Sequence, residues 1–432
     1  MRIPRGLTVV ISLVILAALL AVGYVVSRPR GSAIAEASVS LQAISPNADG
    51  DGDAALIRYR LRRQAVVSVF FEGQDGQRYY FRRDQIRPRG EYEVLFGGIV
   101  EGYSGEGEDV KGEVLARLLP DGTYTWVIEA RDTQTERTDR QTGTLTVQGA
   151  DPQLPDLWEF SVSPELFTPN QDGLDDRVFI NVYVPKAADL TVYLIDNKGE
   201  QYFIPQFQQD RAPGEQGRHL FEWDGGVDLG KDPPPDGRYQ VLVEAQDAEG
   251  QRVRRTGMLE IRDGGVPLAE IVAQPVGDTL KFSSETVIQG DTLYFEVTVW
   301  NYGVAPIRTT GPEPGYVYEQ DEYFASSGFY VESGAWRIGI HCDTCINDYP
   351  WRWSVGRRDE LTAVEVDGKT QYYLMPGQRV VVTGGIRLTD IVESRNPQEF
   401  WVGLIHEDVG ITSKNNRVDP HWIEIVPRST QG

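Results

Sequence analysis

The chain has 432 residues, with 64 Asp and Glu against 42 Lys and Arg, and a formal net charge of −22. So acidic a surface repels nucleic acid and anionic lipid, and we expect no nucleic-acid partner and no basic stripe that offsets the charge. The chain is too long for a single hydrophobic core and predicts two to four domains. Its 45 Gly, 25 Pro and 20 Tyr favour strands and turns over helices.

The first predicted element is a transmembrane helix over residues 7–27, which carry no charged side chain. An apolar helix of about twenty residues spans roughly 30 Å, the thickness of the hydrocarbon core of a bilayer. Arg2 and Arg5 precede the helix, so the positive-inside rule places residues 1–6 in the cytoplasm. We expect a single-pass protein of the cell membrane, with residues 28–37 as a linker and everything beyond them outside the cytoplasm.

A cleaved signal peptide is the alternative interpretation of this segment. Ala33-Ile34-Ala35 fits the small-x-small pattern of a cleavage site, after which the mature protein would begin at Glu36. The apolar run is longer than the usual ~7–15 residues of a signal peptide, and Arg28 and Arg30 separate it from that site. The sequence therefore favours the retained anchor, and both interpretations export the rest of the chain.

Two segments of the exported region, residues 38–149 and 150–263, read alike. Each opens on Pro-Asn-x-Asp-Gly and approaches its end with Pro-Asp-Gly-x-Tyr, at Pro46–Gly50 and Pro120–Tyr124 in the first and at Pro169–Gly173 and Pro235–Tyr239 in the second. Between these motifs lie β-branched and aromatic runs, such as 66–71 and 190–195, that end at Asp-Gly or Asn-Lys-Gly turns. Short strands with frequent turn signals over about 110 residues predict one β-sandwich per segment.

This order of motifs resembles the immunoglobulin-like domain of flagellar hook-capping proteins. The second segment carries every element, including Trp223-Asp224-Gly225. The first departs from the pattern, with Phe96-Gly97-Gly98 in place of Trp-Asp-Gly and an acidic, Gly-rich insertion over residues 101–113. The resemblance implies an immunoglobulin-like fold and a bacterial surface or secreted habitat, and it implies no flagellar function.

The third predicted domain covers residues 264–430. An apolar alternating strand over 293–300 ends in Asn301-Tyr302-Gly303, and Met375-Pro376-Gly377-Gln378 precedes another strand. The pattern resembles the bacterial cell-adhesion-related (CARDB-type) immunoglobulin-like fold. An aromatic-rich insertion over residues 309–373 is a departure that this family does not predict.

Acidic turns open the first two domains and are candidate calcium ligands. The oxygen-bearing residues are Asn47, Asp49, Asp51 and Asp53 in the first turn and Asn170, Asp172, Asp175 and Asp176 in the second. The spacing of the first turn resembles an EF-hand loop up to its glycine, but Arg58 stands where the bidentate Glu is needed. A looser calcium turn is one interpretation, and turn residues that bond their own backbone are the other.

The chain has two cysteines, Cys342 and Cys345. Outside the cytoplasm, cysteines three residues apart favour a small-loop disulfide. His341, His406 and His421 lie in the same domain and leave a zinc site as an alternative, although their spacing matches no zinc module. Free or redox-active thiols are the remaining interpretation.

Trp336, Trp351 and Trp353 are the candidate ligand-binding residues of the third domain. Trp351 and Trp353 alternate with Arg352, so on a strand both indole rings share one face. An exposed face of this kind stacks on sugar rings or anchors a protein partner. The competing interpretation is that these rings cover the core of the domain.

No Gly-x-Ser-x-Gly, His-Glu-x-x-His or P-loop motif occurs, so we expect no enzyme. The sequence predicts an all-β protein with tandem immunoglobulin-like sandwiches behind one N-terminal transmembrane helix. We expect a membrane-anchored surface protein whose first two sandwiches form a stalk that presents the third to a protein or glycan partner. A carbohydrate-binding protein that uses the aromatic residues of the third domain is the alternative. Calcium is the one cofactor that the sequence suggests.

Overall fold

The computed structural model describes residues 13–20, 31–105, 107–206, 212–273, 279–428. The part of the predicted anchor that is described, residues 13–20, is α-helical and exposes its apolar side chains. The rest of the anchor lies outside the described residues. Within the described ranges, no helix has the length and apolar character needed to cross a membrane.

The first β-sandwich, sandwich 1, packs a sheet of order β1-β3-β6 against a sheet of order β2-β10-β9-β4-β5. Its strands are β1 (Ile34–Val39), β2 (Ala43–Ile44), β3 (Ala55–Leu61), β4 (Ala65–Glu72), β5 (Arg78–Arg87), β6 (Gly90–Phe96), β9 (Gly122–Asp132) and β10 (Thr138–Val147). The predicted linker over 28–37 is therefore too long, because β1 already pairs with β3 from Ile34 onward. Ala33 and Ile34 lie in the core of the sandwich.

Sandwich 2 repeats this topology strand for strand, which confirms the internal repeat. A sheet of order β11-β13-β16 packs against one that contains β12, β18, β17, β14 and β15 in that spatial order. The strands are β11 (Trp158–Ser163), β12 (Leu166–Phe167), β13 (Val178–Val184), β14 (Asp189–Ile195), β15 (Gln201–Ile204), β16 (Gly217–Trp223), β17 (Gly237–Gln246) and β18 (Arg252–Ile261), with a 3-10 helix η1 (Val227–Leu229).

The Pro-Asp-Gly-x-Tyr motif builds the same corner in both sandwiches. The hydroxyl groups of Tyr124 and Tyr239 donate to the carbonyl groups of Pro120 and Pro235, at 2.8 and 2.5 Å. This is the tyrosine corner of immunoglobulin-like folds. The motif's aspartate, Asp121 in sandwich 1, accepts hydrogen bonds from two backbone amides that follow the last strand. The motif thus ties the start of one strand to the end of its neighbour.

Sandwich 3 packs a five-stranded sheet against an eight-stranded one. The smaller sheet has the order β19-β22-β29-β24, with β20 paired to β22. The larger sheet has the order β21-β31-β30-β25-β23-β28-β27, with β26 paired to β25. The strands are β19 (Ala269–Val272), β20 (Lys281–Phe282), β21 (Thr286–Ile288), β22 (Thr292–Asn301), β23 (Ile307–Thr309), β24 (Val317–Glu319), β25 (Trp336–Cys342), β26 (Trp351–Ser354), β27 (Thr362–Val366), β28 (Lys369–Leu374), β29 (Arg379–Arg387), β30 (Gln398–His406) and β31 (Val418–Val426), with a 3-10 helix η2 (Glu393–Arg395).

The aromatic-rich insertion of sandwich 3 supplies strands β24 to β28 and also covers the outer face of the larger sheet. There the ring of Tyr349 lies over Gly339 and Gly403, where an added Cβ would come within 2.9 and 2.5 Å of ring atoms. Tyr349 joins Trp401 and Ile405 in a second, smaller core. The insertion therefore adds a layer to the sandwich.

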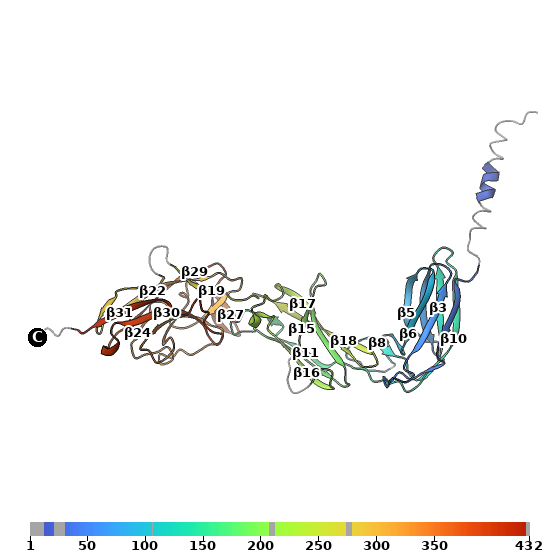
Figure 1. The fold of residues 1–432 in the computed structure, drawn as a ribbon, viewed down its shortest axis with the longest axis horizontal. Coiled ribbons are helices and arrows are strands. Elements are labelled where there is room, and N and C mark those ends of the chain that lie inside the picture. The colour runs from blue at the N-terminus through green and yellow to red at the C-terminus, as the bar shows by residue number, and fades with distance from the viewer. Residues whose placement is uncertain (1–12, 21–30, 106, 207–211, 274–278, 429–432) are drawn as a thin grey trace, which may run out of the picture.

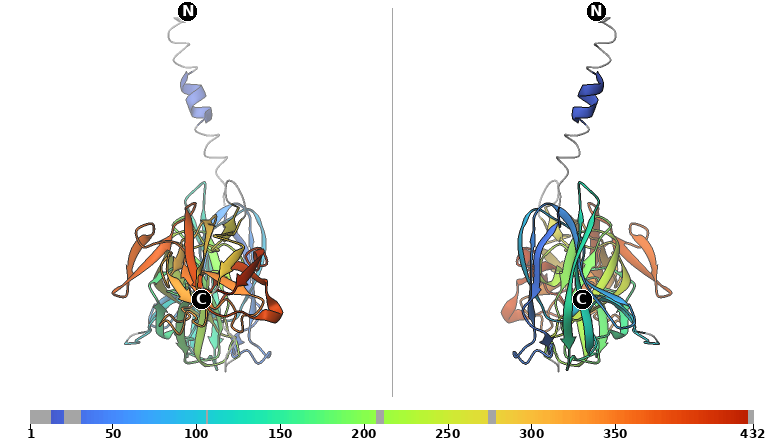
Figure 2. Two further views of the ribbon diagram at one scale, coloured as in Figure 1. Left: turned by 90° about the vertical axis from the view of Figure 1, so that its left-hand side faces the viewer. Right: turned by 90° about the vertical axis from the view of Figure 1, so that its right-hand side faces the viewer.

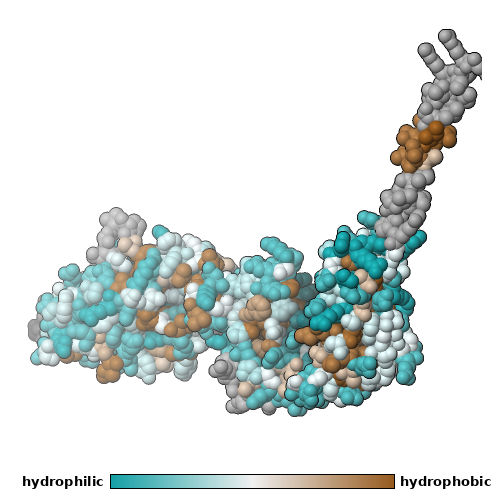
Figure 3. Space-filling model, turned by 45° about the vertical axis from the view of Figure 1, so that its right-hand side comes forward, coloured by the Kyte–Doolittle hydropathy of each residue, from teal (hydrophilic) through white to brown (hydrophobic). Residues whose placement is uncertain are grey.

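The three sandwiches follow one another end to end, with the N-terminal helix and the C-terminus at opposite ends of the molecule (Figure 1). Sandwiches 2 and 3 lie in line, whereas the strands of sandwich 1 run across that line (Figure 1). The β27–β28 hairpin stands out sideways from sandwich 3 when the molecule is viewed along its length (Figure 2). The described part of the N-terminal helix is uniformly apolar, in contrast to the mostly hydrophilic surface of the sandwiches (Figure 3).

Candidate functional site

The predicted aromatic face of sandwich 3 is not a surface. Trp336, Trp351 and Trp353 are 4%, 2% and 0% exposed and belong to the main core. The prediction that Trp351 and Trp353 share one face is correct, but β26 pairs with β25 so that this face meets the opposite sheet. There Trp353 packs edge-on against Phe295 at 4.7 Å between ring centroids. The interpretation of these rings as a sugar-stacking platform is therefore wrong.

The disulfide between Cys342 and Cys345 is present, as the sequence favoured. The three histidines that suggested zinc lie apart. The ring of His341 packs against Tyr349 and Trp401, whereas His406 stacks on Trp336 at 4.3 Å. His421 packs edge-on against Phe282 instead.

The sites that the structure does assemble are the two junctions between sandwiches. At the first junction, β7 (Ile99–Glu101) and β8 (Glu113–Leu118) form a hairpin, and the insertion over residues 101–113 connects these two strands. Strand β8 pairs antiparallel with β18 and so extends the larger sheet of sandwich 2. Val100 of the hairpin belongs to the core of sandwich 1, while Val114 packs on the core of sandwich 2. One hairpin thus takes part in two cores.

Gln251 fills the centre of the first junction and is fully buried. Its amide nitrogen donates to the carbonyl groups of Asp151 and Gln153 and to the carboxylate of Asp247, at 3.2, 2.8 and 2.9 Å. Its amide oxygen accepts from the backbone of Leu118 in the hairpin at 3.4 Å. Since a buried amide is costly to leave unpaired, these bonds fix how the two sandwiches meet.

The second junction is built around the acidic turn that opens sandwich 2. Arg308 of sandwich 3 is 4% exposed and donates to the carbonyl oxygen of Asp172 and to that of Ser333, both at 2.6 Å. Tyr373 is the direct cross-strand partner of Arg308. Its hydroxyl donates to the carboxylate of Asp172 at 2.8 Å. Strands β23 and β28 therefore present one guanidinium and one phenol to the same residue of sandwich 2.

His406 adds a third contact to this junction. Its Nε2 lies 2.7 Å from the carbonyl oxygen of Gln171. A carbonyl group only accepts, so this nitrogen carries the proton. Burial lowers the pKa of His406 to about 4, which keeps the ring neutral at ordinary pH.

Two glycines allow the backbones of sandwiches 2 and 3 to touch. A Cβ added to Gly173 would lie 2.1 Å from the carbonyl oxygen of Ser333, and one added to Gly334 would lie 2.1 Å from the carbonyl carbon of Asp172. Both glycines also have positive φ angles, 83° and 77°. No other residue fits either position without moving the sandwiches apart.

The surroundings of the second turn disfavour the charged form of its carboxyl groups. Burial, and next the charge of Asp176, raise the pKa of Asp172 to about 6. Burial also raises the pKa of Asp176. Three backbone amides, those of Asn170, Asp172 and Gly173, donate to the Asp176 carboxylate. The turn is therefore held by its own backbone and pressed against sandwich 3.

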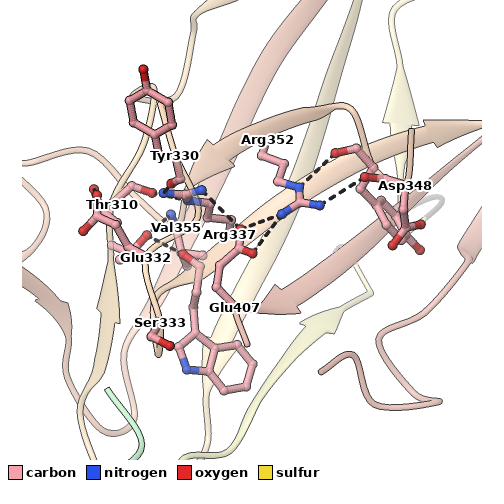
Figure 4. Close-up of polar contacts among 12 residues, drawn as sticks. Thr310, Tyr330, Glu332, Ser333, Arg337, Asp348, Arg352, Val355 and Glu407 are labelled. Carbon is pink, nitrogen blue, oxygen red and sulfur yellow. Dashed lines mark hydrogen bonds and ion pairs between the residues drawn. The ribbon is translucent and has the colours of Figure 1, made fainter. Parts of the chain in front are cut away.

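A buried ion cluster holds the loop of sandwich 3 that contacts this turn (Figure 4). Arg352 donates to both carboxylate oxygens of Glu407 at 2.8 Å, and Arg337 donates to one of them at 3.2 Å. The backbone of Glu407 bonds with Gly334 and with Ala335, each at 2.9 Å. A buried carboxylate between two guanidinium groups thus fixes the position of Gly334, where the backbones of the two sandwiches touch.

Two clefts flank the acidic turn at this junction. One, of about 320 Å³, lies between sandwich 2 and the β27–β28 hairpin. Its lining includes Asp172, Asp175, Val364, Val366 and Tyr373. The other, of about 240 Å³, lies on the opposite side of the turn and includes Asp176, Asp228 and Asp408. The junction is therefore hollowed on both sides of the acidic turn.

The eight predicted calcium ligands form two turns with matching hydrogen bonds. Within the ranges that the structure describes, no group of three or more acidic, His or Cys side chains is arranged to hold a metal ion. In both turns the last aspartate, Asp53 or Asp176, accepts from backbone amides with both carboxylate oxygens. Calcium stays a prediction, and the turn-forming role of these residues is observed.

The residues of the second junction on the sandwich 3 side escaped sequence analysis. Arg308, Tyr373 and His406 stand far apart in the chain and belong to no motif. The one sequence signal is Arg308 itself, a charged residue that follows Ala305, Pro306 and Ile307 and lies in the short strand β23. Antiparallel pairing of β23 and β28 brings it beside Tyr373, which only the fold could show.

No known protein-family model and no curated protein sequence matches this chain. Solved structures with similarity include a DUF4785 family protein from Legionella pneumophila, at 10% identity and a TM-score of 0.22 over 90% of this chain and 84% of that one. A bacterial ice-binding adhesin matches at 11% identity and a TM-score of 0.19, over 83% and 100%. The mouse nectin-like molecule 4 ectodomain matches at 13% identity and a TM-score of 0.16, over 90% of this chain and 98% of that one.

Proposed function

We propose that this chain is a membrane-tethered bacterial surface protein of structural or interaction function, in which two sandwiches support and position a third. The observation that carries the proposal is the construction of the junctions. At the first, a hairpin of sandwich 1 joins the sheet of sandwich 2. At the second, Arg308 and Tyr373 hold a turn of sandwich 2. Buried, bonded junctions of this kind make a stiff support, whereas flexible linkers would leave the sandwiches independent.

The resemblances to the hook-capping and CARDB-type domains belong to this proposal. The tyrosine corner of Tyr124 and Tyr239 supports an immunoglobulin-like ancestry for sandwiches 1 and 2. In sandwich 3, Asn301 of the Asn-x-Gly turn is fully buried and bonds two carbonyl groups. Such a role gives a physical reason for the Asn of that motif.

The retained anchor is also part of the proposal. Cleavage after Ala35 would cut β1 and remove Ala33 and Ile34, which are 2% and 1% exposed, from the core of sandwich 1. Losing two buried side chains and the end of a strand costs several kcal/mol, on the order of 3–5. We therefore propose that the N-terminal segment stays attached and serves as the tether.

The tether is tested by expressing the full chain in a bacterium and washing the membrane fraction with alkaline carbonate. We expect the protein to stay in the pellet and its intact mass to include the N-terminal segment. Release by carbonate, or a mature N-terminus at Glu36, would contradict the anchor.

The stiffness of the support is tested by spin labels at Gln74→Cys in sandwich 1 and Leu229→Cys in sandwich 2, both at exposed sites. We expect a narrow distance distribution, which broadens in a Gly112→Ala variant because the added Cβ would lie 2.5 Å from the side chain of Val253. Gly90→Ala is the matched control, since its Cβ meets only ordinary contacts at 3.8 Å. A broad distribution in the parent chain would refute a stiff first junction.

A further inference from the structure

Sandwich 1 carries opposite charges at its two ends. The end where the N-terminal segment enters, here called the tether-side end, consists of residues 31–33 and three turns, 62–64, 88–89 and 133–137. The pairing Ile34 with Leu61 and Leu61 with Gly90 brings the first three of these segments together. Ala65 pairs with both Arg87 and Asp132, which places the fourth beside them.

The tether-side end is rich in arginine. Its four arginines are Arg62, Arg63, Arg89 and Arg137, against one carboxylate, Glu136. The adjoining strand ends add Arg87, Arg131, Asp132 and Asp139. Arg63 pairs with Asp132 and Arg131 pairs with Glu136. Among the described residues, no carboxylate lies within ion-pair distance of Arg62, Arg89 or Arg137, and all three are exposed. The expectation that no basic region offsets the acidic charge is therefore wrong at this end.

The opposite end of sandwich 1 has the reverse composition. Its turns carry Asp49, Asp51, Asp53, Asp75 and Asp121. Residues 45–54, 73–77 and 119–122 contain no lysine or arginine. The sandwich is therefore an electric dipole whose positive end faces the N-terminal segment, within a chain of net charge −22.

We propose that the tether-side end of sandwich 1 is a docking surface for the anionic headgroups of the bilayer in which the chain is tethered. The proposal rests on the tether proposed above and goes beyond it, because a tether alone does not orient the protein. Charge complementarity is one argument, since unpaired surface arginines are attracted to anionic lipid. Continuity is the other: Arg63 bonds the carbonyl of Gly31 at 2.6 Å, so this end lies at the exit of the N-terminal segment.

An exposed apolar side chain strengthens this surface. Ile86 is 66% exposed and lies one residue before Arg87 at the end of β5. An apolar side chain among cationic ones is the combination with which peripheral proteins enter the headgroup region.

Docking of this end fixes the orientation of the whole molecule relative to the bilayer. Sandwich 1 would stand upright on the bilayer, and sandwiches 2 and 3 would extend sideways from it, alongside the bilayer (Figure 1).

The test uses the full chain reconstituted into vesicles of phosphatidylcholine alone or with about one third phosphatidylglycerol. A donor dye is placed at Gln64→Cys on the tether-side end or at Gln74→Cys on the opposite end, with an acceptor on the lipid headgroups. We expect energy transfer from position 64 to rise in the anionic vesicles and to fall to the neutral level in about 1 M salt, where the screening length is ~3 Å. Position 74 should not respond.

The deciding variant is Arg62→Gln with Arg89→Gln and Arg137→Gln. We expect loss of the anionic-lipid increase at position 64. The matched control replaces Arg218, Arg238 and Arg357 by Gln, which changes the net charge equally at exposed sites of sandwiches 2 and 3. It should keep the increase.

Equal transfer from position 64 in both lipids, or an effect of the control as large as that of the triple variant, would overturn the docking proposal while leaving the tether intact. Flotation separates the two proposals further. Binding to anionic vesicles alone, released by salt, would support the docking surface and refute the tether. Binding to neither vesicle would overturn both.

Discussion

The acidic turns that open sandwiches 1 and 2 have nearly the same internal hydrogen bonds and opposite surroundings. In the first, the amide of Gly50 donates to Asp53 at 2.8 Å, and in the second, Gly173 donates to Asp176 at 2.6 Å. The first turn is exposed, while Asp172 of the second is 4% exposed beneath sandwich 3. One motif therefore serves as a surface turn in one repeat and as the centre of a junction in the other.

The titration of equivalent aspartates shows what this difference means. The backbone amide of Asp51 lowers the pKa of Asp49, whereas burial raises the pKa of Asp172 to about 6. A local motif sets the bonds of the turn, and the neighbouring domain sets its electrostatics.

The largest expected effect comes from the glycines of the two turns. Both have positive φ angles, 90° at Gly50 and 83° at Gly173, so each Ala substitution carries a similar local strain of about 1 kcal/mol. Gly173→Ala would also drive a Cβ to 2.1 Å from the backbone of Ser333, whereas Gly50 faces open space. We expect Gly173→Ala to destabilise the second junction by roughly 3–5 kcal/mol, measured by calorimetry. Equal losses for the two variants would remove the contrast between the turns.

The second prediction concerns pH. The raised pKa of Asp172 gives stability that is full below about 3.8 and lost as pH rises through about 6. The lowered pKa of His406 gives stability that is present above 6.5 and lost as pH falls through about 4. Each group changes the unfolding free energy by about 3 kcal/mol across its pH window. Since they oppose each other in one window, we expect the junction of the parent chain to be nearly insensitive to pH between 4 and 6.

Single substitutions should show the pH dependence that each of the two groups contributes. Asp172→Asn leaves the His406 contribution, so stability should rise with pH, and His406→Gln leaves the Asp172 contribution, so stability should fall. Denaturant titrations at several pH values measure both. Asp49→Asn in the exposed turn is the control and should reproduce the parent profile, and slopes of the same sign in the two junction variants would contradict the assignment.

A smaller effect is expected for the bond that only the second turn receives. Tyr373→Phe removes the 2.8 Å hydrogen bond to Asp172 and leaves the ring in place. We expect a loss of about 1–2 kcal/mol in the unfolding free energy near pH 7, since a hydrogen bond to a charged group is removed. The loss should shrink as pH falls through about 6, where Asp172 becomes protonated. Tyr294→Phe, at a 53% exposed tyrosine, should change little.

Calcium gives the smallest expected effect and separates the turns in another way. If the motif binds calcium, the exposed turn of Asp49, Asp51 and Asp53 is the accessible one, because sandwich 3 covers Asp172. We expect millimolar Ca²⁺ to raise the melting temperature of sandwich 1 slightly, by mass action on the folded state. Identical melting curves in Ca²⁺ and EDTA would rule the ion out.

Much of the fold was predictable because its signals are local. The runs 66–71 and 190–195 lie within β4 and β14, and the repeat of motifs corresponds to two sandwiches of one topology. The boundary at residue 38 was wrong because the pairing of β1 with β3 is non-local. The alternation of Trp351 and Trp353 gave their shared face but not whether that face meets water or another sheet.

The sequence by itself determined the β-rich class, the repeat, the turn chemistry and the disulfide partners, because each depends on residues close in the chain. Only the tertiary structure decided the role of the second acidic turn, the burial of the tryptophans and the arginine-rich end of sandwich 1. Each of these depends on what antiparallel pairing and domain contact bring together: Arg308 beside Tyr373, and three separate turns at one end of a sandwich. The net charge of −22 could not reveal that end, because a sum over the whole chain does not say where the positive residues lie.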